Sequence, residues 1–319
     1  MRHLAVPLIA LAVLLALPAA LTPYTQDLVV RIAVYAIFAL SLQLLVGMTG
    51  LVSLGHAAFL GIGAYATVLV SGDAGASLAK VLPAAIGAAA LYALFVGALS
   101  LRTRGVYFIM VTLAFAQMAY FVAHDTKLGG GSDGIFLYVK PALELGGATL
   151  VNLDDRQHLY YTVMAALALT YALLALIARS RFGHALAGIR VNEQRMRAAG
   201  FATYRYKLAA FVIAASLAAL AGVLLAAKDG AVNPELMSWH ESGAVLLMLI
   251  LGGIGSLNGA VIGAIAFTLL KELFQSEALL GPLAPHWQLS LGLAIIGFVA
   301  LLPKGLIGLR VRLSGVPHG

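Results

Sequence analysis

Long apolar runs, separated by short polar stretches, make up most of this chain and restrict what it can fold into. The runs lie at 4–21, 29–46, 51–70, 81–101, 106–123, 159–178, 208–227, 243–254, 257–270 and 289–302. Hydrophobic residues amount to 62% of the sequence and charged residues to 10%, far from the composition of soluble domains. Because a helix needs roughly 20 apolar residues to cross a bilayer, we predict an all-α integral membrane protein. It would be a polytopic helical bundle of about ten hydrophobic segments, of which about 8 to 10 cross the membrane.

Glycine-rich blocks interrupt this pattern at two places. The stretch 243–270 is long enough for one span, but the glycine-rich segment 252–259 falls within it, and glycine weakens helices and favours turns. An earlier block at 47–63 is similarly rich in glycine. We therefore predict broken or re-entrant helices at both blocks, and paired interruptions of this kind indicate a translocation site near the midplane. For any single glycine, close packing between helices is the alternative explanation.

The placement of charge predicts the orientation of the chain. If the amino terminus is inside, basic residues concentrate in inner segments around 102–104, 179–207 and 304–312, whereas the acidic residues other than Glu193 fall in or beside outer segments. An excess of Lys and Arg marks cytoplasmic loops, so both termini are expected in the cytoplasm. We interpret 1–26 as a retained first span; a cleaved secretory signal is the alternative and would leave the other spans oriented as before.

Charge and polar loops also limit the classes of function. The formal charge of +7 is confined to inner loops without interleaved aromatic residues, which favours membrane orientation and attraction to anionic lipid over nucleic-acid binding. The longest polar interval, 124–158, is too short for a core of its own, so we predict one transmembrane domain over 1–319. This interval is expected to be an outer loop. It either shapes the pore mouth or docks a substrate carrier, or it only connects two spans.

The basic inner segment 179–207 predicts two short helices. Four apolar residues share one helical face in its first half: Phe182, Ala185, Leu186 and Ile189. This spacing favours an amphipathic helix with an exposed apolar ridge, which either fits a partner's groove or lies on lipid. Asn192 is placed to cap a second helix, and Gly200 to end it in a left-handed conformation.

Three blocks of the sequence resemble a known family. They are Gly47-Met-Thr-Gly-Leu-Val-Ser-Leu-Gly-His56 with its continuation to 65, the segment 180–211 with Ala221-Gly222, and the glycine block 252–260. In order and spacing they resemble the inner-membrane permeases of the branched-chain amino acid class of ATP-binding-cassette (ABC) importers, most closely the LivM type. The resemblance covers nearly the whole chain from about residue 29 onward.

This resemblance implies a multi-pass permease of the bacterial inner membrane that imports branched-chain or aliphatic amino acids, with urea or short amides as the alternative. It implies a homologous LivH-like permease, two ABC ATPase subunits and a periplasmic substrate-binding protein as partners. The loop 179–207 would contact the ATPase through Arg181, Phe182, Gly183, Leu186, Ile189, Arg190, Glu193 and Gly200. His184 departs from the family pattern, in which an arginine is expected.

Polar residues within the spans agree with an importer driven from outside. No Asp or Glu lies in the middle of a span, which disfavours a proton-coupled carrier. No phosphate-binding loop is present, so we expect no cofactor on this chain and ATP on partner subunits. A secondary carrier or channel independent of ATPases is the second alternative.

Candidate polar groups beside the translocation path are Ser53, His56, Gln117, Ser256 and Asn258. For His56, a packing role is the alternative. The histidines have neither metal-like spacing nor a companion cluster of carboxylates, and the chain has no cysteine. We therefore expect no catalytic residues and no metal site.

Overall fold

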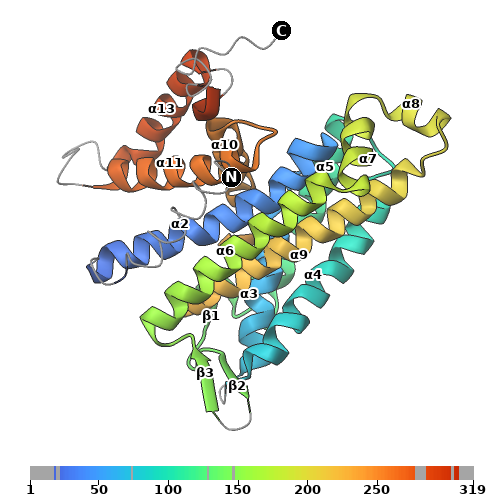
Figure 1. Ribbon diagram of the computed structural model, residues 1–319. Coiled ribbons are helices and arrows are strands. Elements are labelled where there is room, and N and C mark those ends of the chain that lie inside the picture. Colours follow the sequence, from blue (N-terminus) through green and yellow to red (C-terminus); the bar gives the residue numbers. More distant parts are fainter. Residues whose placement is uncertain are drawn as a thin grey trace, which may run out of the picture.

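The computed structural model describes residues 18, 22–72, 75–127, 129–145, 148–276, 285–302 and 305–308. Within these residues the protein is almost entirely helical (Figure 1). Its longer helices are α2 (Pro23–Gln43), continued by the π-helix η2 (Leu44–Thr49), α3 (Ala57–Ser71), α4 (Leu78–Ser100), α5 (Val106–Asp125), α6 (Arg156–Arg179), α7 (Arg181–Val191), α8 (Glu193–Ala198), α9 (Thr203–Asp229), α10 (Trp239–Gly252), α11 (Leu257–Gln275) and α13 (Trp287–Leu301). The predicted all-α architecture is confirmed, while the predicted first span lies outside the described residues apart from Pro18.

Seven of the described helices are long and apolar enough to cross a membrane, and α3 and α10 are shorter apolar helices. At about 1.5 Å per residue, α3 and α10 extend only about 21–23 Å, less than the ~30 Å of hydrocarbon in a bilayer. Each adjoins a glycine block. The chain leaves the helical conformation between Thr49 and Ala57 and again between Gly252 and Leu257. The predicted interruptions are thus confirmed; the number of crossings stays a prediction.

Short polar side chains cap the amino ends of several of these helices. Asp155 accepts a hydrogen bond from the Gln157 backbone N–H at 2.8 Å and so caps α6. Ser256 caps α11 in the same way through the Gly259 N–H at 3.2 Å. Each contact satisfies one of the backbone donors that a helix leaves free at its amino end.

Helix α9 lies at the centre of the bundle and packs against α2, α3 and α4. The close crossing with α3 depends on glycine. A Cβ atom at Gly222 would lie 1.9 Å from the carbonyl oxygen of Leu60, and one at Gly63 would lie 2.3 Å from that of Ala219. Small residues let helix backbones approach where lipid supplies no hydrophobic drive for association. Close packing therefore explains these glycines.

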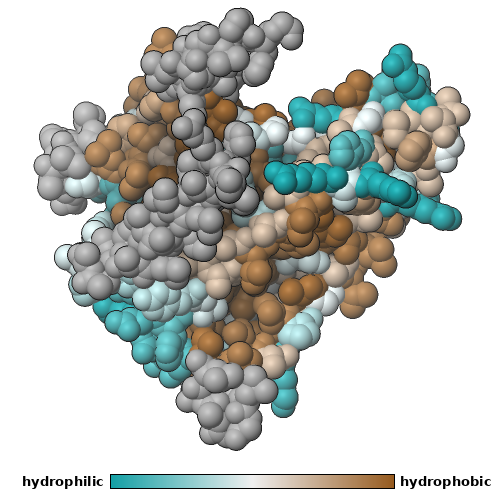
Figure 2. Space-filling view, in the orientation of Figure 1, coloured by the Kyte–Doolittle hydropathy of each residue, from teal (hydrophilic) through white to brown (hydrophobic). Residues whose placement is uncertain are grey.

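The outer surface carries the apolar residues that a bilayer would cover. Large apolar side chains are exposed along α4, α5, α6 and α13, among them Leu91, Phe95, Met110, Leu169 and Ile296. Figure 2 shows hydrophobic residues over the middle of the visible face and hydrophilic residues gathered toward two opposite ends. This distribution matches a membrane-embedded helical bundle whose two ends face water.

The polar interval 124–158 contains two small antiparallel ladders. Strand β1 (Ile135–Phe136) pairs with β4 (Ala231–Val232), which follows α9, and β2 (Ala142–Leu145) pairs with β3 (Ala148–Asn152). The 3-10 turn η3 (Gly131–Asp133) precedes β1, and η4 (Pro234–Met237) follows β4. The pairing of β1 with β4 ties this interval to the end of α9.

Candidate coupling site

A sharp bend at Ser180 joins the long helix α6 to the short helix α7. Ser180 has an extended backbone conformation (φ −80°, ψ 166°), and its Oγ accepts a hydrogen bond from the Gly183 N–H at 3.2 Å. A Cβ atom at Gly183 would lie 2.1 Å from the carbonyl oxygen of Ile177. The bend therefore needs a small capping residue followed by glycine. We call α7 and α8 together the elbow, and Figure 1 shows it at one end of the bundle.

The apolar face of α7 is turned into the protein, so the prediction of an exposed ridge is wrong. Ala185, Leu186 and Ile189 are buried, and α7 packs against α6, η2 and α9. Phe182 is half-buried and stacks on Tyr206 with ring centroids 5.6 Å apart. The amphipathic spacing correctly identified a covered face. The partner that covers it is this chain's own bundle.

Arg190, on the polar side of α7, connects the elbow to both glycine blocks. Its guanidinium Nη1 donates a hydrogen bond to the backbone carbonyl of Gly47, within the π-helix η2. Its side chain also lies near Gly50 and Gly255: a Cβ added at Gly50 would sit 3.3 Å from the arginine Cγ, and one added at Gly255 would sit 3.8 Å from the arginine Nη1. Gly50 and Gly255 have φ of +74° and +100°, a region that favours glycine. One side chain is thus hydrogen-bonded to the first interruption of the bundle and lies near the second.

Gln43 forms a second connection between the glycine blocks. With its amide oxygen turned toward the glycine block 252–259, Gln43 accepts hydrogen bonds from the backbone N–H groups of Gly255 at 2.7 Å and Ser256 at 2.9 Å. Gln43 is buried and precedes the π-helix directly. π-helical turns inside helices are frequent at functional sites, and here the π-helix begins directly after Gln43 and contains Gly47, the acceptor of the Arg190 hydrogen bond.

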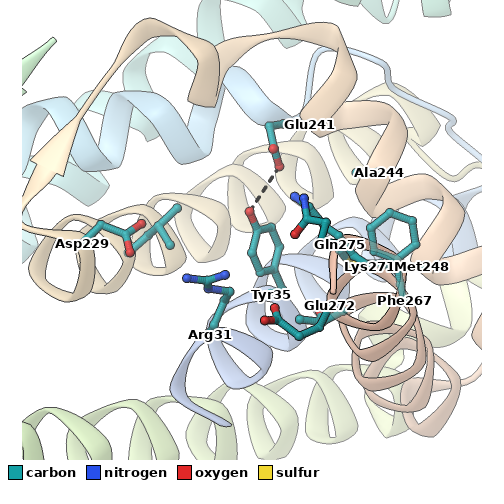
Figure 3. Close-up of a pocket in the computed structure, with 12 residues that line it drawn as sticks. Arg31, Tyr35, Asp229, Glu241, Ala244, Met248, Phe267, Lys271, Glu272 and Gln275 are labelled. Atoms are coloured by element: carbon teal, nitrogen blue, oxygen red, sulfur yellow. Dashed lines mark hydrogen bonds between the residues drawn. The ribbon is translucent and has the colours of Figure 1, made fainter. Parts of the chain in front are cut away.

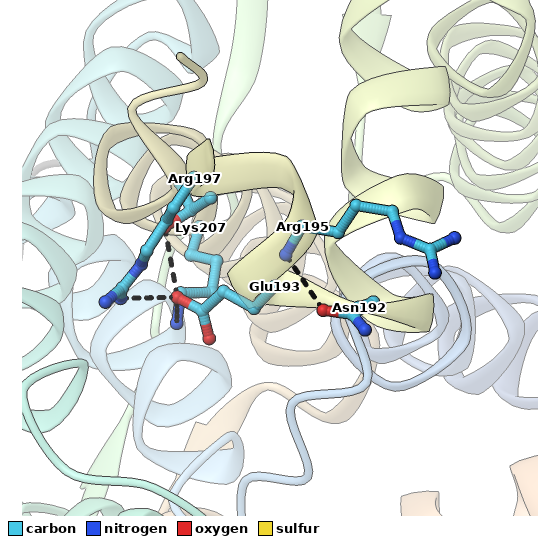
Figure 4. Close-up of polar contacts among 6 residues, drawn as sticks. Asn192, Glu193, Arg195, Arg197 and Lys207 are labelled. Carbon is cyan, nitrogen blue, oxygen red and sulfur yellow. Dashed lines mark hydrogen bonds and ion pairs between the residues drawn. The ribbon is translucent and has the colours of Figure 1, made fainter. Parts of the chain in front are cut away.

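The second helix of the elbow is held by a charged network (Figure 4). The Glu193 carboxylate accepts hydrogen bonds from Arg197 at 2.7 Å and from the Thr203 hydroxyl at 3.0 Å, and Lys207 Nζ lies 3.0 Å from it. The Lys207 side chain is only 6% exposed, so this contact ties α8 to the first turns of α9. Asn192 caps α8 by accepting from the Arg195 N–H at 2.9 Å.

Opposing influences act on the titration of Glu193. Partial burial acts to raise its pKa, but the hydrogen bond and charge of Lys207, with hydrogen bonds from Thr203 and Arg197, outweigh burial. They hold the pKa of this carboxyl below its usual 4.5. After α8 the chain turns at Gly200, whose φ is +87°. The prediction that Asn192 caps α8 and that Gly200 ends it is therefore confirmed.

Two of the candidate path residues are enclosed by the protein. His56 is buried, its Nε2 lies 2.8 Å from the Ser41 hydroxyl, and its ring stacks on Phe38 at 5.4 Å. Ser53 is buried as well, and its Oγ accepts from the Gly55 N–H at 3.2 Å. These contacts favour the packing interpretation for His56 in this conformation.

The other candidate path residues are more accessible. Asn258 is exposed and accepts a hydrogen bond from the Tyr171 hydroxyl at 2.7 Å. Gln117 is half-buried on α5, and the half-buried Ser256 caps α11. Among the described residues no hydrogen bond joins the five candidate path side chains to one another. Their role beside the path stays a prediction.

Sequence reasoning missed three polar residues that position these elements. Two of them are Gln43, which joins the two glycine blocks, and Lys207, which ties α8 to α9. Ser242 is buried on α10 and accepts a hydrogen bond from the Ala57 N–H at 3.0 Å, which caps the start of α3. The available signal was a lone polar side chain in an apolar run, since such groups are expensive in a bilayer and usually find partners.

Comparison with known proteins bears on what this geometry serves. Residues 24–302 match a family described as "Branched-chain amino acid transport system / permease component". The chain belongs to this family. The matched range includes both glycine blocks and the whole elbow, and the permease is accordingly a multi-pass protein of the bacterial inner membrane.

Individual relatives refine the comparison. The permease is 31% identical over 320 residues to the high-affinity branched-chain amino acid transport system permease protein LivM of Escherichia coli (strain K12), covering 94% of the chain and 74% of LivM. It is 26% identical over 290 residues to LivH of Salmonella typhimurium, covering 86% of the chain and 91% of LivH. A shorter match, 35% over 91 residues, joins 27% of the chain to 23% of the xylose transport system permease protein XylH of Escherichia coli (strain K12). The resemblance stated from the sequence is confirmed.

Proposed function

We propose that this permease is the LivM-type transmembrane subunit of an ABC importer for branched-chain or aliphatic amino acids. It forms half of the translocation path beside a homologous, LivH-like permease. Two ATPase subunits act on the elbow from the cytoplasm, and a soluble substrate-binding protein delivers cargo on the opposite side. The family match and the similarity to LivM and LivH support this assignment.

The position of Arg190, bonded to one glycine block and close to the other, carries the proposal. Coupling requires that movement at the cytoplasmic surface reach the part of the bundle that opens. Packed helices transmit displacement as rigid bodies, whereas interruptions absorb changes in backbone angle. Arg190 donates a hydrogen bond to the Gly47 carbonyl, and its side chain lies near Gly50 and Gly255. A shift of the elbow would therefore act directly on the two interruptions.

The surface proposed to meet the ATPase is the exposed side of the elbow. Val191, the last residue of α7, is 84% exposed, unusual for an apolar side chain outside the lipid-facing helices. Arg181 and Arg195 are also exposed, and their side chains form no ion pair among the described residues. Arginine is enriched at protein interfaces and among their hot spots. Ile189, by contrast, is 4% exposed and belongs to the internal packing.

Co-purification from membranes tests this surface. Val191→Asp and Arg195→Glu should lose the ATPase subunits while the permease elutes as a folded protein, because both side chains are exposed. Lys80→Gln, on an exposed residue at the far end of α4, is the matched control and should retain them. Undiminished ATPase association in both elbow variants would refute the coupling assignment. Ile189→Asp should instead reduce the yield of folded permease.

Orientation can be tested separately because the chain has no cysteine. In Val191→Cys, a membrane-impermeant maleimide should label the new thiol in inside-out vesicles and leave it unlabelled in right-side-out vesicles. The reverse pattern would place the elbow on the outside and contradict the proposed function.

A further inference from the structure

A cavity of about 130 Å³ lies among α2, α9, α10 and α11. It is at the end of the bundle opposite the elbow, because Asp229 on its wall is separated from Thr203 by the full length of α9, about 40 Å. Figure 3 shows Tyr35 at its centre, with charged side chains of both signs around it. Those charged residues are Arg31, Asp229, Glu241, Lys271 and Glu272.

Several of these charges have no partner of opposite sign within the cavity. Asp229 is neutralised by Lys228 at 2.8 Å. Among the described residues, Glu241 accepts a hydrogen bond only from the Tyr35 hydroxyl, at 3.4 Å. Within the described residues no ion pair joins Arg31 or Lys271 to Glu241 or Glu272.

Among the described residues, the two basic residues of the cavity, Arg31 and Lys271, also lack a carboxylate partner within the cavity. Arg31 has only a long contact with Asp27, at 3.8 Å, and Lys271 lies over the ring of Trp287 at 5.5 Å. Partly enclosed charges that face a cavity without partners are costly. A ligand that carries both signs of charge would pair with both sets at once.

A buried hydroxyl points to the same conclusion. Thr268 lines the cavity and is 5% exposed, and its Oγ1 has no hydrogen-bond partner in the part of the chain that the structure describes. Buried polar groups are almost always satisfied, so an unpaired one beside a cavity indicates a missing partner. The remaining wall is apolar and is formed by Leu225, Ala244, Met248 and Phe267.

We propose that this cavity is a binding site for an α-amino acid zwitterion with an aliphatic side chain. The carboxylate faces Arg31, the ammonium faces Glu241, and the side chain lies on the wall that contains Met248 and Phe267. The site deepens the proposed function, on which it rests, since it places a cargo contact at the outer end of this subunit.

Equilibrium binding to the assembled importer in nanodiscs, without nucleotide or soluble receptor, tests the site. The probes are L-leucine, leucinol, which lacks the carboxylate, and 4-methylpentanoate, which lacks the ammonium. Glu241→Gln should weaken leucine and leucinol about tenfold or more, because a hydrogen bond to a charged group is lost. Arg31→Gln should weaken leucine and 4-methylpentanoate similarly. Ala244→Leu fills the cavity and should abolish binding of all three, whereas Lys80→Gln should bind like the unaltered protein.

The pattern across probes separates a specific site from a folding defect, since misfolding would weaken all three probes in both charge variants. Absence of saturable leucine binding to the unaltered complex, or equal binding in Glu241→Gln, Arg31→Gln and Ala244→Leu, would overturn the site. ATPase co-purification is measured on the same preparations. If it is retained while leucine binding fails, the site alone is refuted; if it is lost from the unaltered permease, the proposed function fails.

Discussion

Removing the carboxylate of Glu193 should loosen the elbow, because it would leave the Lys207 ammonium buried without an acceptor. The Nζ atom lies 3.0 Å from Glu193, and the lysine side chain is only 6% exposed. Breaking a buried ion pair by removing one partner costs about 3–5 kcal/mol. Glu193 itself is 22% exposed, so water screens part of the interaction. We expect Glu193→Ala to lower the free energy of opening α8 by about 2–3 kcal/mol.

A second substitution isolates the charge. Lys207→Met keeps most of the length of the side chain and removes its charge. Apolar replacement of a whole buried pair is often close to neutral. The double variant Glu193→Ala, Lys207→Met should therefore recover to within about 1 kcal/mol of the natural protein. The coupling energy from this cycle reports the pair itself, apart from the other contacts of Glu193.

Hydrogen exchange measured by mass spectrometry over 193–200, with the permease in nanodiscs, reads this opening directly. A loss of 2–3 kcal/mol corresponds to exchange about 30- to 150-fold faster. Peptides from α4 serve as the internal control and should exchange unchanged. Equal exchange in Glu193→Ala and the natural protein, or no recovery in the double variant, would refute the argument that the buried lysine depends on this carboxylate.

Three further predictions concern pH and packing. Because the pKa of Glu193 is lowered in the native protein, the stability that this carboxylate contributes is complete above its ordinary pKa of 4.5. This stability is lost as the pH falls through the native pKa, so hydrogen exchange of α8 should accelerate there. Glu193→Gln, which has no carboxylate to titrate, should show no such acceleration. Gly222→Ala should cost about 1–3 kcal/mol in thermal unfolding, whereas Gly87→Ala, with open space around it, should be neutral or slightly stabilising. His56→Ala should cost about 2–4 kcal/mol by emptying a buried site beside Ser41 and leave cargo affinity unchanged. A changed affinity with undiminished stability would instead make His56 a path residue.

Local patterns in the sequence predicted much of the elbow correctly. Asn192 and Gly200 begin and end α8 as expected, because capping and left-handed turns depend on adjacent residues and on few others. The apolar face with Leu186 and Ile189 was correctly placed on one side of an amphipathic helix, but the prediction that this face is exposed for a partner or for lipid was wrong. Periodicity shows that a helix buries one side; it carries no information about which surface lies against it.

The apolar runs and glycine blocks, read from the sequence alone, determined a helical membrane protein with two interruptions, since a bilayer leaves backbone groups few other ways to be satisfied. Only the tertiary structure decided that Arg190 and Gln43 join those interruptions, and that Arg31, Glu241 and Thr268 surround one cavity. These residues lie far apart in the chain, and their proximity follows from how α2, α9, α10 and α11 cross. The crossings depend on long-range packing between helix surfaces, which no local pattern specifies.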